Sequence, residues 1–63
     1  MPIIDITLLE GRDLATKKRL MVEVTDLVES TLDVPRASIR VLVRELPKSH
    51  YCVGGVAKDE LDG

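Results

Sequence analysis

The chain has 63 residues and a net charge of −2, and its nine basic residues are interspersed with eleven acidic ones, which leaves no basic patch for the backbone of nucleic acid. Tyr51 is the only aromatic residue, so a platform for base stacking is also excluded. A domain this small buries only about 60% of the surface that its unfolded chain exposes. Cys52 and His50 are the only residues of their types, so an internal disulfide and a Cys/His metal site are both excluded, and oligomerisation is the expected source of further buried surface.

The N-terminal residues lack the charged, apolar and small-residue regions of a signal peptide, and no apolar run approaches the ~20 residues that span a bilayer. The single free thiol of Cys52 suits a reducing compartment. We therefore expect one domain over residues 1–63, located in the cytoplasm, with neither a membrane nor a nucleic acid as its partner.

The first half of the chain predicts a strand followed by a helix. Residues Pro2–Leu9 are β-branched and roughly alternating, which is typical of a strand. Asp13 is the predicted helix N-cap, and apolar residues at spacings of three and four then indicate an amphipathic helix of about five turns. Pro35 disfavours helix for the residue before it, so the helix is expected to end near Leu32 or Asp33. The apolar positions of the helix are Leu20, Val24, Leu27, Val28 and Leu32.

The second half predicts another strand and a small hairpin. Residues Ser38–Leu46 alternate again, and Pro47 closes this strand. In Tyr51–Lys58, Gly54 and Gly55 stand between two short apolar stretches, which indicates a tight turn because glycine reaches positive φ angles.

A strand, a long helix and a second strand predict a right-handed βαβ unit with parallel strands, and the fold class is therefore α+β with a C-terminal β-hairpin. One helix covers only one face of the sheet. The other face carries apolar residues that are a liability in water, together with two arginines. An interface between chains that encloses a polar pocket would accommodate both kinds of residue. The residues concerned are Ile3, Leu9, Leu42, Arg40 and Arg44.

Pro2 is a candidate catalytic base. Initiator methionine is normally removed before a small residue, so the mature chain is expected to begin with the secondary amine of Pro2. The pKa of an α-amino group is near 8, and partial burial and neighbouring cations both lower it. A neutral amine of this kind can abstract a proton at cellular pH.

Arg12 and Arg40 are candidates for binding an anionic substrate. Arg12 lies at the strand-to-helix turn, where the helix N-terminus also favours negative charge. Arg40 lies early in the second strand, on the face without helix cover. The planar guanidinium group binds a carboxylate through two hydrogen bonds and keeps its charge.

Several motifs occur together in this chain. Met1 precedes Pro2, the first strand ends in Leu8–Arg12 (LLEGR), and Leu32–Pro35 (LDVP) closes the helix. Ser38–Val41 (SIRV) opens the second strand, and His50–Gly55 (HYCVGG) forms the terminal motif. In this combination the chain resembles the 4-oxalocrotonate tautomerase family over nearly every position from 2 to 56.

The resemblance implies a protomer whose dimer has a four-stranded sheet and whose hexamer is a trimer of dimers, with sites shared between chains. It implies that Pro2 is the general base and acid in the tautomerisation of 2-hydroxymuconate-like dienols to 2-oxo acids, by 1,3- or 1,5-proton transfer. Arg12 would hold the distal carboxylate, and Arg40 of a neighbouring chain would bind the 2-oxo acid end. Leu9 and Tyr51 would contribute to the substrate-binding wall. The only partners implied are a small carboxylate substrate and further copies of the chain, with no cofactor and no metal.

The chain departs from the family at two positions. Tyr51 stands where reference members carry phenylalanine, so a hydroxyl group enters the pocket wall. Cys52 stands where they carry glycine, and we interpret it as a small hydrophobic residue, the other interpretation being an oxidant-sensitive thiol. His50 matches the family and is interpreted as structural.

Two alternative functions remain open from the sequence. A hydrolytic dehalogenase or hydratase of 3-haloacrylates, as in sister enzymes, needs a carboxylate to activate water, and Val53 stands at the matching position. A catalytically silent oligomeric binding protein is favoured if Met1 is retained, because the nitrogen of Pro2 is then an amide without a basic lone pair.

Overall fold

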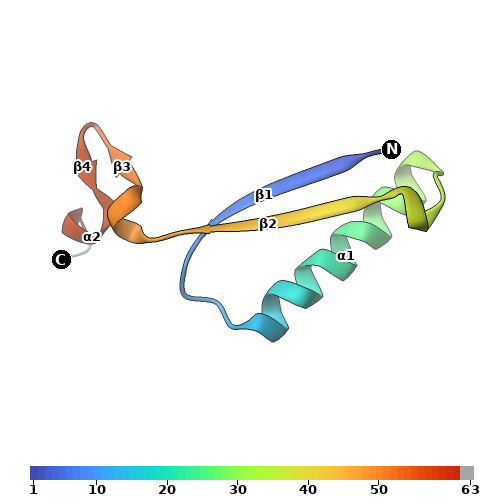
Figure 1. Ribbon diagram of the computed structural model, residues 1–63, viewed down its shortest axis with the longest axis horizontal. Coiled ribbons are helices and arrows are strands. Elements are labelled where there is room, and N and C mark those ends of the chain that lie inside the picture. The colour runs from blue at the N-terminus through green and yellow to red at the C-terminus, as the bar shows by residue number, and fades with distance from the viewer. Residues whose placement is uncertain (62–63) are drawn as a thin grey trace.

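A computed structural model describes residues 1–61, whose main body is a strand, a long helix and a second strand (Figure 1). β1 spans Ile3–Leu9, α1 spans Leu14–Leu32 and β2 spans Arg40–Leu46. The 3₁₀ turn η1 (Arg36–Ser38) connects α1 to β2. β1 and β2 pair in parallel, from Ile3 opposite Arg40 to Leu9 opposite Leu46. The predicted βαβ unit is therefore confirmed.

The two faces of the β1–β2 sheet differ because α1 lies along only one of them (Figure 1). The residues of the covered face are half-buried, and Ile39, just before β2, is buried. On the opposite face Ile3 is 65% exposed and Leu42 is 43% exposed. The open apolar face expected from the sequence is therefore present in the single chain. The covered residues are Ile4, Ile6, Leu8, Val41 and Val43.

Both ends of α1 are set by local capping interactions. The Asp13 carboxylate accepts a hydrogen bond from the Thr16 backbone N–H at 2.8 Å, as its predicted role as N-cap requires. Hydrogen bonding from Thr16 also holds the pKa of Asp13 below its usual value, because it stabilises the ionised form. At the other end Asp33 takes a left-handed conformation (φ 55°), and its N–H donates to the Glu29 carbonyl. The helix therefore ends where Pro35 predicts.

The C-terminal segment forms a small arm at the far end of β2 from the N-terminus (Figure 1). The turn η2 (Lys48–His50) leads into the antiparallel pair β3 (Cys52–Val53) and β4 (Val56–Ala57), followed by the short helix α2 (Lys58–Leu61). Gly54 and Gly55 join β3 to β4 with φ angles of 60° and 84°. Two positive φ angles are what a tight hairpin turn requires, so the predicted hairpin is confirmed.

The single chain is extended and has almost no core of its own. Its radius of gyration is 15.0 Å, whereas a compact chain of this length has a value of about 11 Å. Its accessible surface is 4722 Å², compared with about 4,000 Å² for a compact chain of this mass. The expected apolar positions Leu27 and Leu32 of α1 are 63% and 55% exposed. Much apolar surface is thus left for contacts with other chains.

Two boundaries differ from those predicted. β2 begins at Arg40 instead of Ser38, because residues 36–38 form the η1 turn, in which the Ser38 N–H donates to the Pro35 carbonyl. β1 begins at Ile3, one residue after the predicted start. Among residues 1–61, no helix has both the length and the apolar character needed to cross a bilayer.

The N-cap of α1 provides a test of the fold. Replacement of Asp13 by Ala removes the acceptor for the Thr16 N–H, and we expect the Tm at pH 7 to fall by about 5 °C. Because the pKa of Asp13 is lowered in the folded state, its ionised form stabilises the fold above the unfolded-state pKa, and this effect is lost as the pH falls through the folded-state pKa. The Tm difference should therefore shrink between pH 5 and pH 2 in circular dichroism melts.

Asp13→Asn is the matched control, since asparagine keeps the capping oxygen without a titrating group. If the Asp13→Ala variant has the same Tm as the wild type at pH 7, the cap contributes nothing to stability.

Candidate functional site

Parallel pairing of β1 with β2 brings Pro2 next to Arg40. The Arg40 backbone N–H donates to the Pro2 carbonyl oxygen at 3.0 Å, which extends the ladder by one bond beyond β1. Pro2 is half-buried, whereas the preceding Met1 is 78% exposed. Two of the residues predicted from the sequence therefore lie together at the amino-terminal edge of the sheet.

The Arg40 side chain is on the sheet face that α1 leaves open, since exposure alternates along β2. Its guanidinium Nη1 donates to the Ala37 carbonyl at 2.8 Å. This contact with a neutral acceptor orients the guanidinium group and leaves its charge uncompensated. Arg40 can therefore still bind an anion.

The arginines of the chain fall into two groups. Arg19, Arg36 and Arg44 are each paired with carboxylates, with N–O distances between 2.8 and 3.1 Å. Arg12 and Arg40 form no ion pair with any residue of the described range 1–61. The two arginines predicted to bind substrate are thus the two that have no counter-charge in the described part of the chain. A permanently charged, exposed guanidinium group without a partner carboxylate is suited to binding a carboxylate ligand.

The other three predicted site residues lie at the opposite end of the protomer. Leu9 is the last residue of β1, and Arg12 follows it in the turn to α1. The seven residues of β1 extend over about 23 Å at 3.3 Å per residue. Tyr51 belongs to the C-terminal arm, beyond η2, and is exposed. Within one chain, a full strand length therefore lies between Pro2 and Arg40 at one end and Leu9, Arg12 and Tyr51 at the other.

The remaining chemically notable residues are on the C-terminal arm. Cys52 is a free, exposed thiol in β3, and His50 and Val53 beside it are also exposed. Within residues 1–61, no three His, Cys, Asp or Glu side chains form a group that could hold a metal ion. An open hollow on α1, lined by Thr16, Arg19, Leu20 and Glu23, contains none of the predicted site residues.

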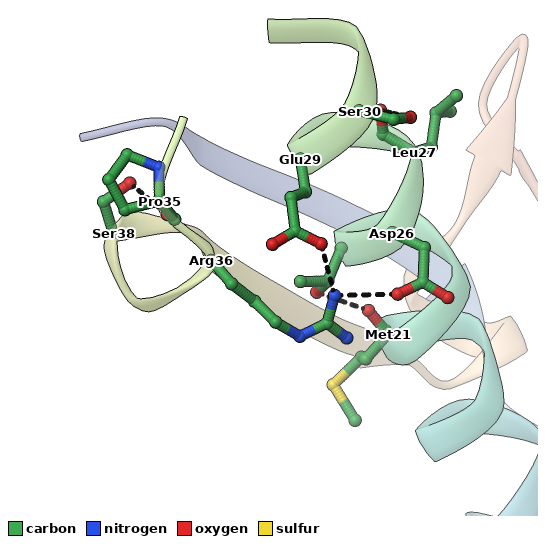
Figure 2. Close-up of polar contacts among 9 residues, drawn as sticks. Met21, Asp26, Leu27, Glu29, Ser30, Pro35, Arg36 and Ser38 are labelled. Atoms are coloured by element: carbon green, nitrogen blue, oxygen red, sulfur yellow. Dashed lines mark hydrogen bonds and ion pairs between the residues drawn. The ribbon is translucent and has the colours of Figure 1, made fainter. Parts of the chain in front are cut away.

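Sequence reasoning did not identify the ion pairs of the η1 turn, which precedes Arg40. Arg36, in the η1 turn, reaches back to α1, where its Nη1 donates to Asp26 at 2.8 Å and to Glu29 at 3.0 Å (Figure 2). These hydrogen bonds raise the pKa of Arg36 above its usual value, because they stabilise the charged form. A sequence signal was present, since two acidic residues three apart on a helix share one side of it. Their pairing with Arg36, however, depends on the path of the chain after Pro35.

Comparison with known proteins identifies the family. The sequence profile described as "Tautomerase enzyme" matches residues 2–60, nearly the whole chain. This chain belongs to the tautomerase family. The predicted resemblance is thereby confirmed, and the parallel βαβ unit with its terminal antiparallel pair is the fold of this family.

Individual tautomerases are similar to this chain along their whole length. A probable tautomerase of Staphylococcus haemolyticus is 45% identical over 62 residues, which are 98% of this chain and 100% of that one. A 4-oxalocrotonate tautomerase isozyme from Methylibium petroleiphilum superposes with a TM-score of 0.90 at 36% identity, covering 97% of this chain and 95% of that one. A heterohexameric 4-oxalocrotonate tautomerase from Chloroflexus aurantiacus superposes with a TM-score of 0.88 at 36% identity, covering 97% and 98%.

Proposed function

We propose that the mature chain, without Met1, is a cytoplasmic isomerase that converts 2-hydroxymuconate-like dienols to 2-oxo acids. The observation that carries this proposal is the pair of arginines, Arg12 and Arg40, that have no carboxylate partner among residues 1–61. Two such arginines match the two carboxylates of a dicarboxylate substrate. Membership of the tautomerase family supports the reaction class.

In the proposed reaction the neutral amine of Pro2 takes the proton of the 2-hydroxyl group. The electron pair of the O–H bond forms the carbonyl, and the resulting dienolate is then protonated at carbon by the ammonium group of Pro2, in a 1,3- or 1,5-transfer. The guanidinium group of Arg40, from a neighbouring chain, stabilises the negative charge that develops near the 2-oxo acid end. Arg12 holds the distal carboxylate, and Leu9 and Tyr51 form the wall that limits access of water to the amine.

A complete site of this kind needs more than one chain. Among residues 1–61, β1 pairs with β2 on one side only, so its other edge is available for pairing with another chain. Antiparallel pairing of β1 with β1 of a second copy, related by a twofold axis, would give a four-stranded sheet and bring Pro2 of one copy toward Leu9 and Arg12 of the other. The extended shape and the open sheet face support assembly into a homo-oligomer, for which we propose a hexamer, a trimer of these dimers.

Pro2→Ala tests the catalytic amine. The initiator methionine is also removed before alanine, so the variant replaces a secondary amine by a primary one, and we expect kcat with 2-hydroxymuconate to fall by about 10²-fold. The measurement is the steady-state rate for protein whose circular dichroism spectrum and oligomer size match the wild type. Full activity in this variant would rule out the secondary amine as the base.

Intact-mass spectrometry of the wild type provides a second check on the same step. Active protein should have the mass of the chain without Met1, because retained methionine turns the Pro2 nitrogen into an amide. Activity in a fraction that consists only of Met1-containing chains would contradict the mechanism.

Arg12→Ala tests whether Arg12 and Arg40 bind different ends of the substrate. If Arg12 holds the distal carboxylate, its loss should lower kcat/KM for 2-hydroxymuconate by about 10- to 100-fold, as expected for a charged hydrogen-bonded pair. A monocarboxylate such as phenylenolpyruvate should be almost unaffected. Arg40→Ala is the matched comparison and should impair both substrates, and equal losses for both in Arg12→Ala would contradict the assignment.

Leu42→Asp tests the assembly. Leu42 is 43% exposed on the open sheet face, and a charge there is costly once the face is covered. We expect sedimentation velocity at micromolar concentration to show smaller species than the wild type, with reduced activity. Lys18→Glu, which adds negative charge on an exposed part of α1, should leave the oligomer intact, and an unchanged oligomer in Leu42→Asp would show that this face is not an interface.

A further inference from the structure

The Arg36 side chain ties the η1 turn to α1. The Nη1 atom of Arg36 donates to Asp26 at 2.8 Å and to Glu29 at 3.0 Å, and Figure 2 shows it reaching from the turn to both carboxylates. Asp26 and Glu29 are three positions apart and therefore lie on the same side of the helix. One guanidinium nitrogen thus links the segment after Pro35 to the C-terminal half of α1.

The same turn orients the Arg40 side chain. Its first and last residues are Arg36 and Ser38, and the carbonyl of Ala37 between them accepts the hydrogen bond from the Arg40 guanidinium at 2.8 Å. The Arg36 carbonyl accepts the N–H of the buried Ile39 at 3.1 Å. The direction in which the Ala37 carbonyl points is therefore fixed by a turn whose outer side is held by Arg36.

The next contact along the chain joins Arg40 to Pro2. Arg40 donates its backbone N–H to the Pro2 carbonyl at 3.0 Å, directly after the turn. The three contacts form a continuous series: α1 carboxylates to Arg36, the Ala37 carbonyl to the Arg40 guanidinium, and the Arg40 N–H to Pro2. A small displacement of the turn therefore moves the Arg40 guanidinium, the group with which this chain would bind the 2-oxo acid end of a substrate.

We propose that Arg36 is a positioning residue, which fixes the direction of the Arg40 guanidinium by anchoring the η1 turn to Asp26 and Glu29. The catalytic importance of this role rests on the proposed function. Arg36 is half-exposed, with 47% of its side chain accessible, and exposed ion pairs contribute little to global stability. Arg36 therefore affects the position of the Arg40 guanidinium more than the stability of the fold. Displacements of about 1 Å in a catalytic site lower reaction rates strongly.

Amide hydrogen exchange tests the anchor without any substrate. Arg36→Met removes the donors and keeps an aliphatic stem, and we expect the Ile39 and Arg40 amides to exchange about two- to tenfold faster, while the Val24 amide in α1 is unchanged. Arg19→Met is the matched control, because Arg19 is paired with Glu23 on the same helix. Arg36→Lys, which keeps a charged donor, should restore part of the protection.

A double-mutant cycle tests the route to catalysis. We expect Arg36→Met to lower kcat/KM for 2-hydroxymuconate about two- to fivefold in the wild-type background and to have no further effect in the Arg40→Ala background. Arg19→Met should leave kcat/KM unchanged in both backgrounds.

The two measurements separate the possible failures. Unchanged exchange at Ile39 and Arg40 in Arg36→Met, or faster exchange along the whole chain, overturns the positioning role. An equal loss of kcat/KM with and without Arg40 also overturns it. Absence of turnover in the wild type refutes the proposed function instead, and the exchange data then decide by themselves whether Arg36 holds the turn.

Discussion

Parallel pairing of β1 with β2 is the constraint on which the rest of the molecule depends. Parallel strands need a crossover connection, which here is α1, and a single helix covers one face of the sheet and leaves the other open. The same pairing brings the amino-terminal ends of both strands together, so that Pro2 and Arg40 are hydrogen-bonded neighbours. It also leaves Arg12 a full strand length away from Pro2. One protomer therefore holds two separated parts of the proposed site.

The distribution of charge separates arginines with a structural role from those available to a ligand. Arg44 donates one hydrogen bond to Asp5 and forms an ion pair with it on the open sheet face, so this pair is already neutralised when the face is covered. Lys17 joins α1 to β2 through Glu45 at 2.7 Å, close to the turn that carries Arg12. Each of these ion pairs neutralises charges on the strands and helix that form the fold. The positive charges of Arg12 and Arg40 are not compensated by any residue from 1 to 61, as the proposed binding of a dicarboxylate requires.

The small size of the chain connects stability with activity. A protomer with a radius of gyration of 15.0 Å and exposed apolar side chains on both its sheet and its helix has too little core to be a compact unit by itself. In the proposed assembly the contacts that bury these side chains are also the contacts that bring Pro2 of one chain to the other site residues, Leu9, Arg12, Arg40 and Tyr51, of neighbouring chains. A variant that weakens the assembly is then expected to lose activity and stability together.

The sequence by itself determined the elements and the chemically important residue types, because their signals are local: the alternation of β1, the Asp13 cap, the stop before Pro35 and the glycines of the hairpin each act on neighbouring residues. Only the tertiary structure decided which of these residues meet. The left-handed Asp33, the η1 turn and the pairing of Arg36 with Asp26 and Glu29 depend on how the chain returns from α1 to β2. The adjacency of Pro2 and Arg40, and their distance from Arg12 and Tyr51, likewise follow from strand pairing between residues nearly forty positions apart, which no local pattern specifies.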